Sequence, residues 1–273
     1  MRFVAVGDVM VDVVCAALPP PGGRVHAEVS IRVGGSAVNA AAAAAEAGSS
    51  AAVVGRVGND SVGEFVAAEL LGLGVEARLA RDVDLPTGVA VALGTSVVAN
   101  RGANARLSPD DIPDLEDADA LCVSGFALFQ SGSAEAARTA LEGFEGWAGI
   151  DVGSPGLAAS ARDFERGGRT VLLATADEAR AMTDEGPEDA VRTLASRFAV
   201  ACVKFGERGA IAAAGDKVER ASVEPVVRRS PFGAGDAFGA VLLVELARGS
   251  DLGRALEVAC TAGARAAGAG SPA

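Results

Sequence analysis

Several residue types that carry chemistry are scarce in this sequence. It has 273 residues with no tyrosine, one tryptophan and 4% aromatic residues in all. His26 is the only histidine, which excludes any mechanism that needs two histidines and argues against a Ser-His-Asp triad. The four cysteines, Cys15, Cys122, Cys202 and Cys260, lie far apart with no C-x-x-C spacing. Because each lies among apolar residues, we expect buried free thiols and not disulfides or zinc ligands.

Positive charge and long apolar runs are also scarce. The 24 Lys and Arg residues against 36 Asp and Glu residues give a formal net charge of −12. Nucleic acids and anionic membranes repel such a protein, so neither is expected as a main partner. Glu46 interrupts the alanine-rich tract after Asn39, so no membrane-spanning segment is expected. Strand-like residues 3–6 lead directly into Gly7 and Asp8 with no signal-peptide pattern, and we expect a cytoplasmic protein.

Apolar strand and helix patterns are abundant. Half of the residues are hydrophobic and 22% are charged, which suits one large α/β domain or two small ones. Short apolar runs alternate with helical patterns, which indicates a mostly parallel sheet covered by helices on both faces. The predicted strands are residues 3–6, 51–54, 120–124, 147–151, 170–173 and 200–205. The predicted helices are residues 36–47, 61–71, 134–144, 187–198, 236–248 and 252–267.

Two segments depart from this pattern because polar and apolar residues alternate along them. Residues 24–33 alternate strictly, which is typical of a half-buried antiparallel strand. Residues 88–99 alternate in a similar way, after Leu85-Pro86-Thr87. We interpret both as a small β-sheet flap inserted into the α/β body. The alternative is an edge extension of the main sheet.

A turn of small residues, Gly233-Ala234-Gly235-Asp236, precedes a helix that is apolar on nearly all sides. Such a helix is buried, so its N-terminus opens into a cleft, where the backbone N–H groups and the helix dipole favour an anion. A carboxylate beside an anion site makes sense if Asp236 accepts a proton while a phosphoryl group is held next to it. The alternative is that Asp236 is an ordinary helix cap. We reject a dinucleotide-binding loop, because no strand follows.

A second glycine-rich turn, Gly34-Gly35-Ser36-Ala37-Val38-Asn39, opens the alanine-rich helix. Two glycines let the backbone approach a ligand closely. Asp12 follows the first predicted strand at its carboxyl end, where ligands of parallel sheets bind. A carboxylate and an amide can hold adjacent hydroxyls, so Asp12 and Asn39 suit recognition of a polyol. For Asn39 helix capping is the alternative.

With both turns in view, the chain resembles the ribokinase-like sugar kinases, the PfkB carbohydrate kinase family. The first turn, continued to Gly48, and the second turn, continued to Phe238, are similar to the two signatures of the family. Further similar stretches are residues 54–63, 86–88 and 203–209. The matches occur in the family's order and cover nearly the whole chain.

The resemblance implies a ribokinase-like three-layer α/β/α fold with a mostly parallel central sheet and a small β-sheet lid. It implies one kinase domain over residues 1–273, with lid segments at approximately 13–33 and 76–104. The implied activity is ATP-dependent phosphorylation of a hydroxyl on a small sugar or sugar-like substrate. Asp236 would be the base, and the backbone of Gly233, Ala234 and Gly235 would form the anion hole. The acceptor would be contacted by Asp12, Gly34, Gly35 and Asn39.

The resemblance also implies where the nucleotide binds. Lys204, Gly206, Glu207 and Gly209 would form part of the nucleotide wall, and the C-terminal helix that carries Cys260 would lie near the adenine. Mg²⁺ would arrive with ATP and be held largely through phosphates and water, not by a set of protein ligands. The lid would close over the sugar, and in many relatives it also mediates homodimerisation.

Two positions depart from the family pattern. The usual Asn-x-x-Glu motif is here Thr175-Ala176-Asp177-Glu178, which puts nucleotide affinity or metal dependence in question. Glu178 is retained and could still order metal-bound water. Ser230, followed by Pro231, stands where relatives commonly carry an aspartate tied to a monovalent cation, so potassium activation is doubtful.

Three alternatives to a plain sugar kinase stay open. A phosphosugar kinase of the same family needs cations for the second phosphate, and Arg32, Arg101 and Arg106 are candidates unless they are simply solvated. A nucleoside kinase needs an aromatic stacking face, which the aromatic-poor flap strands disfavour. The third alternative is a catalytically impaired relative that only binds its ligand.

Overall fold

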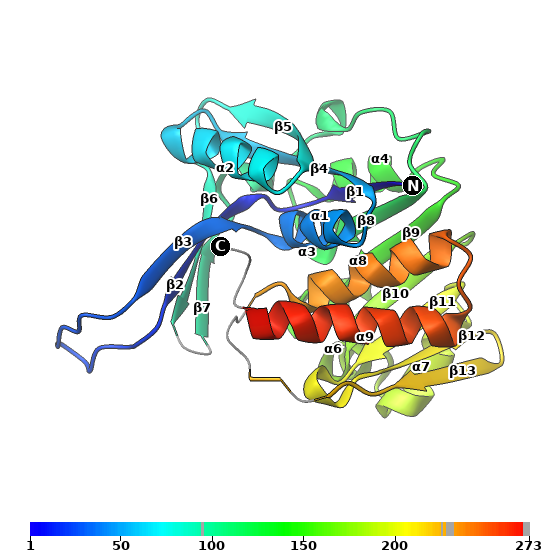
Figure 1. Cartoon of the computed structure of the whole chain (residues 1–273). Helices are drawn as coiled ribbons and strands as arrows, with labels where there is room; N and C mark the ends of the chain where they lie inside the picture. Colours follow the sequence, from blue (N-terminus) through cyan, green and yellow to red (C-terminus); the bar gives the residue numbers. More distant parts are fainter. Residues whose placement is uncertain (94–95, 225, 228–231, 270–273) are drawn as a thin grey trace.

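The structure is a computed structural model that describes residues 1–93, 96–224, 226–227 and 232–269 (Figure 1). A nine-stranded sheet forms its middle layer, in the order β13-β12-β11-β10-β9-β8-β1-β4-β5. The strands from β11 to β5 in this order run parallel, and β12 and β13 join by antiparallel pairing. The strand bounds are β1 (Arg2–Val6), β4 (Ser50–Gly58), β5 (Val75–Asp82), β8 (Ala120–Ser124), β9 (Trp147–Asp151), β10 (Thr170–Thr175), β11 (Val200–Lys204), β12 (Ala210–Ala214) and β13 (Lys217–Ala221).

Helices cover both faces of this sheet. On β1, Phe3 and Ala5 belong to one buried hydrophobic cluster, whereas Val4 and Val6 belong to another on the opposite face. The first cluster includes residues of α1 (Ser36–Glu46), α2 (Ser61–Gly72), α8 (Ala234–Ala247) and α9 (Leu252–Ala269). The second includes residues of α3 (Gly125–Leu128), α4 (Ala134–Leu141), α5 (Pro155–Ala161), α6 (Ala176–Thr183) and α7 (Pro187–Ala195). The predicted three-layer α/β/α fold is therefore confirmed.

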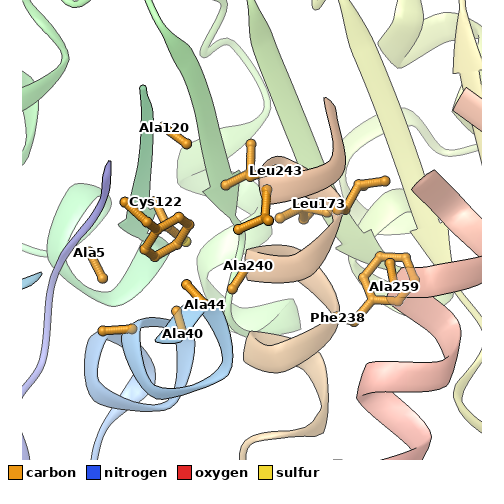
Figure 2. Packing of buried hydrophobic residues seen from close by; sticks show 14 of the residues in the cluster. Ala5, Ala40, Ala44, Ala120, Cys122, Leu173, Phe238, Ala240, Leu243 and Ala259 are labelled. Carbon is orange, nitrogen blue, oxygen red and sulfur yellow. The ribbon is translucent and has the colours of Figure 1, made fainter. Parts of the chain in front are cut away.

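Small residues let the central helix α8 lie close to the sheet and to its neighbour α1. A Cβ added to Gly149 on β9 would come within 2.4 Å of Leu243 Cδ1 on α8. Figure 2 shows Ala40 and Ala44 of α1 near Ala240 of α8, and all three side chains are buried. The residues of α8 from 237 to 244 are all buried, as its all-apolar sequence predicts. This packing fixes the position of the α8 N-terminus relative to the strand ends.

A separate four-stranded sheet projects from one side of the main body (Figure 1). Its order is β3-β2-β6-β7, with bounds β2 (Met10–Cys15), β3 (Val29–Gly34), β6 (Gly88–Leu93) and β7 (Ser96–Asn100). We call this sheet the lid. The two alternating segments of the sequence therefore form their own small sheet, as predicted, and not an extension of the main sheet.

The lid boundaries differ from the prediction. The lid begins at Met10 and not near residue 13. Its first strand is β2, which the sequence analysis did not predict. Assigning residues 76–82 to the lid is wrong, because β5 pairs with β4 in the main sheet. The strand predicted at 24–33 begins only at Val29, since its pairing with β2 ends at the Cys15–Val29 pair. Residues 88–99 form two strands, β6 and β7, instead of one.

Some strands and helices of the structure were not predicted from the sequence. The sequence of β12 is Ala-Ile-Ala-Ala-Ala, and alanine favours helices, so only pairing with β11 and β13 makes this segment a strand. The strand β13 and the helices α3, α5 and α6 were not predicted either. Among the helices of the described residues, none combines the length and the apolar character that crossing a bilayer requires.

Candidate active site

Three parallel strands end side by side beneath the N-terminus of α8. Their last residues are Asp151 of β9, Thr175 of β10 and Lys204 of β11, and Thr175 and Lys204 are partners in the register. The carboxyl ends of parallel strands are where ligands of such sheets bind. A Cβ added to Gly235 would lie 3.4 Å from Lys204 Nζ, so the start of α8 lies against these strand ends.

The turn that begins α8 has the geometry of an anion site. Gly233 is the N-cap and has a φ of 85°, in the left-handed region that favours glycine. The first turn of a helix leaves backbone N–H groups without helical partners, and Gly233, Ala234 and Gly235 are only partly buried. Their N–H groups and the helix dipole can therefore meet an anion from the cleft.

Asp236 follows this turn and contacts Asn39 across the two helices. Asn39 Nδ2 donates a hydrogen bond to Asp236 Oδ2 at 2.9 Å, although the residues are 197 positions apart. Burial raises the pKa of Asp236 to about 7; Asp151 and Asp12 also raise it, whereas the Asn39 hydrogen bond and Lys204 oppose them. A carboxyl group that titrates near neutral pH suits a general base. The structure therefore brings together two predicted site residues from distant parts of the chain.

Lys204 is held by a carboxylate that the sequence analysis did not assign to the site. Lys204 Nζ and Asp151 Oδ2 form an ion pair at 2.5 Å. Burial of the ammonium would lower the pKa of Lys204, but Asp151, with Glu178 and Asp236, outweighs burial and raises it. The available signal for Asp151 was its position as the last residue of a predicted strand.

Thr175 and Glu178 form a capping box at the start of α6. The Thr175 backbone N–H donates to Glu178 Oε2 at 2.7 Å, and the Glu178 N–H donates to Thr175 Oγ1 at 3.3 Å. Thr175 thus caps α6 in place of the usual asparagine. Glu178 is only 3% exposed, and burial followed by the nearby Asp151 raises its pKa, while the Thr175 hydrogen bonds and Lys204 oppose the rise.

The residues predicted to bind the acceptor lie where the lid meets α1. Asp12 lies on the lid strand β2 and not directly after β1, which corrects its predicted location. It faces Gly34, where an added Cβ would lie only 2.1 Å from Asp12 Oδ2. Burial raises the pKa of Asp12 to about 6, and the Arg32 guanidinium opposes the rise. Gly35 has a φ of 95°, and an added Cβ there would overlap the Asp8 carbonyl oxygen.

A cavity of about 830 Å³ begins beside these residues. One end is lined by Arg32, Asn39, Phe232 and Gly233, and the cavity continues between α1, α2 and α9. Asp236 faces a much smaller hollow that it shares with Ser36, Cys122, Ser124 and Asp151. Asn39 lines the large cavity and donates to Asp236, which does not line it, so Asn39 lies between the large cavity and the hollow at Asp236.

The other residues predicted to bind the nucleotide lie after β11 and on α9. Gly206 and Gly209 have positive φ values of 62° and 86° in the short 3₁₀ turn after β11, and Glu207 between them is exposed. Cys260 on α9 packs below β13, with Sγ 3.8 Å from the Ala221 carbonyl oxygen, and burial raises its pKa to about 11. The structure does not bring Cys260 into the cluster around Asp236.

Two sequence predictions concern cations, one potassium and the other Mg²⁺. Ser230 and Pro231, which bear on potassium, lie outside the described residues. Within the described ranges, no group of three or more His, Cys, Asp or Glu side chains is arranged to hold a metal ion. Asp151, Glu178 and Asp236 are the carboxylates that act on the Lys204 ammonium.

Similarity to known proteins agrees with this geometry. A family model described as pfkB family carbohydrate kinase matches residues 2–272. A 2-dehydro-3-deoxygluconokinase of Thermoproteus tenax is 29% identical over 98% of this chain and 89% of its own length. An ATP-dependent ribose-1-phosphate kinase of Halopiger xanaduensis is 31% identical over 98% of this chain and 92% of its own.

The fold is shared with solved structures. A putative ribokinase II from E. coli, solved in complex with ATP and Mg²⁺, superposes with a TM-score of 0.85 at 20% identity, covering 98% of this chain and 92% of that one. The family match and the two relatives establish the activity class, and the solved structure shows a common fold. The chain belongs to the PfkB family of carbohydrate kinases.

Proposed function

We propose that the protein transfers the γ-phosphoryl group of ATP to a hydroxyl of a small sugar-like acceptor, with Asp236 as the base. The observation that carries this proposal is the position of Asp236, in the first turn of α8 above the strand ends and hydrogen-bonded to Asn39. A carboxylate in that place can take a proton from a hydroxyl that also contacts Asn39.

The properties of Asp236 suit late proton transfer. A sugar hydroxyl has a pKa far above 7, so it stays protonated until the phosphoryl group begins to transfer. With a pKa of about 7, a large fraction of Asp236 is ionised at neutral pH and can accept that proton. The Asn39 amide holds the carboxylate in place through the transfer.

The charge on the transferring phosphoryl group meets the α8 turn and Lys204. The backbone N–H groups of Gly233, Ala234 and Gly235 supply donors, and the Lys204 ammonium lies next to Gly235. Asp151 fixes the ammonium through the ion pair, so little reorganisation is needed when the phosphoryl group arrives.

The nucleotide would follow the strand ends away from α8. We assign its wall to Thr175, Lys204, Gly206, Glu207 and Gly209, with the α9 helix around Cys260 at its adenine end. Asp151 and Glu178 would hold water on Mg²⁺, which when bound with ATP neutralises phosphate charge. Asp151 ends β9 and Glu178 lies just after β10. Both carboxylates therefore lie at the strand ends, where we place the Mg²⁺ bound to the phosphates.

A second copy of this chain is the partner that we propose for the lid. Ile31 and Val98 are 63% and 64% exposed, and Val29 is 54% exposed, on lid strands β3 and β7. Burying such side chains against an identical surface stabilises a dimer through the hydrophobic effect.

The proposal is tested by ADP release from purified protein with ATP, Mg²⁺ and a panel of acceptors. The panel should include derivatives of gluconate and ribose 1-phosphate, because the two relatives are named for such compounds. It should also include neutral sugars and nucleosides. Acceptor-dependent ADP release supports the kinase. ATP binding without turnover on any acceptor contradicts it and favours a ligand-binding relative.

A further inference from the structure

The chain crosses from the main sheet into the lid between β1 and β2. Asp8 and Val9 lie at this crossing, and both are buried, at 4% and 0% exposure. The next residue, Met10, already pairs with β3 and β6 of the lid. Asp12, which we propose to bind the acceptor, follows Val9 by three positions on the same strand. The place of Val9 therefore determines where Asp12 lies relative to the main body.

The side chain of Asn104 holds the backbone of Val9 at this crossing. The Val9 N–H donates to Asn104 Oδ1 at 2.8 Å, and Asn104 Nδ2 donates to the Val9 carbonyl oxygen at 2.9 Å. In an antiparallel pair, two facing residues exchange two such hydrogen bonds. The amide of Asn104 therefore pairs with Val9 as a neighbouring strand would, one residue before the lid pairing begins.

The Asn104 amide is itself fixed in one orientation. Asn104 is only 2% exposed, and Nδ2 also donates to the Arg101 carbonyl oxygen at 2.9 Å. Both amide hydrogens and the amide oxygen are thus bonded. Exchanging the amide N and O would place an N–H group against the Val9 N–H, so the observed orientation is the one that fits. A Cβ added to Gly88, the first residue of β6, would lie 2.8 Å from Nδ2, so the amide lies close against this lid strand.

The turn that carries Asn104 is packed into the main body. It is the 3₁₀ turn Gly102–Arg106, in which Ala103 is fully buried. Leu107, directly after the turn, is 2% exposed and belongs to one of the two buried clusters of the main sheet. Asn104 therefore joins the start of a lid strand to the packed body.

A second contact, made just before this turn, holds Asp8. Arg101 donates to the Asp8 carboxylate from Nη2 at 2.7 Å and from Nε at 2.9 Å. Arg101 was a candidate cation for a second phosphate, but its guanidinium is paired within the chain. The Asp8 carbonyl oxygen lies against Gly35, where an added Cβ would come within 2.2 Å of it. The crossing is thus held beside the glycine-rich turn that begins α1.

The place of Asp12 matters because the proposed acceptor must meet Asp12 and Asp236 at once. Asp12 acts on the pKa of Asp236, so the two carboxylates lie close enough to interact. The strand β2 connects Val9 to Asp12 over roughly 10 Å, so a shift of Val9 is carried along the strand. A misplacement of about 1 Å can lower the rate of a reaction about 100-fold.

We propose that Asn104 is a positioning residue for the acceptor, because its amide fixes Val9 and thereby the place of Asp12. The acceptor hydroxyl then meets Asp236 at the distance that proton transfer requires. Asn104 acts through β2 and does not contact the acceptor. This inference rests on the proposed kinase function and adds a residue that supports the same site.

The kinetic test is steady-state ADP release by wild type and Asn104→Ala, with the best acceptor of the panel. We expect Asn104→Ala to lower kcat/KM for the acceptor about 100-fold and to leave KM for ATP unchanged. Asn104→Ser should give a smaller loss, because its hydroxyl keeps a donor and an acceptor but is shorter than the amide. Asn104→Ser also provides the comparison if Asn104→Ala does not fold.

Thr170→Val is the matched control for the loss of buried hydrogen bonds. Thr170 is fully buried, and its Oγ1 donates to the Gly167 carbonyl oxygen at 2.8 Å and accepts from Arg166 Nη1 at 2.7 Å. It begins β10, at the opposite end of that strand from Thr175. We therefore expect Thr170→Val to keep the wild-type kinetic constants, even where thermal unfolding shows that both variants are destabilised.

Hydrogen exchange gives a second readout that requires no acceptor. In Asn104→Ala the backbone amides of residues 9–15 should exchange faster than in wild type, because the start of β2 is no longer held. The amides of β1 and β4 should keep their wild-type rates. Thr170→Val should leave the exchange of residues 9–15 unchanged.

Three results would overturn the inference. These are unchanged exchange of residues 9–15 in Asn104→Ala, an unchanged kcat/KM for the acceptor in this variant, and an equal loss of kcat/KM in Thr170→Val. If wild type releases no ADP with any acceptor, the kinase proposal fails separately. Calorimetric binding of the same panel then decides the inference: weaker binding by Asn104→Ala than by Thr170→Val supports it, and no difference contradicts it.

Discussion

A single ammonium group, Lys204 Nζ, lies among three carboxylates at the strand ends. Asp151 pairs with it directly, and Glu178 and Asp236 contribute more distant attraction. Glu178 and Asp236 would be harder to ionise without this cation, because it lowers the pKa of both carboxyls. Lys204 therefore has two roles in our account, since it offers charge to the phosphoryl group and helps to keep Asp236 ionised.

Replacing this lysine tests both roles. The chain has only one other lysine, Lys217, which is exposed on β13 and pairs with Glu219, so Lys217→Met is a matched control. We expect Lys204→Met to lower kcat about 100-fold, comparable to removal of one oxyanion donor. The apparent pKa of Asp236 should also rise, because the opposing cation is gone. Equal kinetics of the two variants, measured by ADP release over a range of pH, would contradict the account.

At the scale of elements, the two glycine-rich turns were predictable because each stands directly before a helix with a distinctive composition. The apolar sequence of α8 and the alanine-rich sequence of α1 predicted buried helices, and the structure confirms both. The strands β2 and β5 were not predictable in the same way. Their place in two different sheets depends on pairing, of β2 with β6 far along the chain and of β5 with β4 across the helix α2.

The same reason explains which site residues the sequence revealed. Asn39 and Asp236 belong to recognisable turns, so their types and positions made them candidates, and the structure brings the two side chains together. Asp151 and the Arg32–Asp12 pair depend on strand register, which sequence patterns set only weakly. Asp12 stays a predicted acceptor-binding residue, but the sequence analysis placed it directly after β1 and the structure places it on β2.

The contact between β2 and the turn before α1 makes a prediction at this scale. A Cβ on Gly34 would overlap the Asp12 carboxylate, so Gly34→Ala should displace Asp12 from the acceptor position. We expect KM for the acceptor to rise tenfold or more, about the effect of one charged hydrogen bond, with KM for ATP unchanged. Gly167→Ala is the control, because nothing lies within 4 Å of a Cβ added there and Gly167 does not line the large cavity. An acceptor KM unaffected in both variants would show that Asp12 does not contact the acceptor.

For the whole molecule, our proposals give the lid two roles, which are to cover the acceptor and to meet a second copy of the chain. Asp12 on β2 and Arg32 on β3 lie on one face of this sheet, and β3 and β7 expose apolar side chains. One small sheet can therefore cover the acceptor on one face and meet a second copy on another surface. Formation of the dimer would hold the lid in one orientation.

Oligomeric state measured by light scattering after size exclusion tests this arrangement. We expect wild type to be a dimer, and Ile31→Lys to shift it to monomer, because a buried charge without a partner is costly. Leu71→Lys is the control, since Leu71 on α2 is 80% exposed but lies outside the lid. A wild-type monomer at micromolar concentration, or the same shift in both variants, would contradict a lid-mediated dimer.

The central claim is that Asp236 is the base, and the most direct measurement is the pH dependence of turnover in wild type and Asp236→Asn. Since burial raises the pKa of Asp236 to about 7, its ionised form is lost as the pH falls. We predict that wild-type kcat/KM falls about tenfold per pH unit below pH 7 and levels off above it. Asp236→Asn should lower kcat by roughly 10²- to 10⁴-fold, lack this transition and bind ATP with unchanged affinity. Near wild-type turnover in the variant, or an unchanged transition near pH 7, would contradict the account.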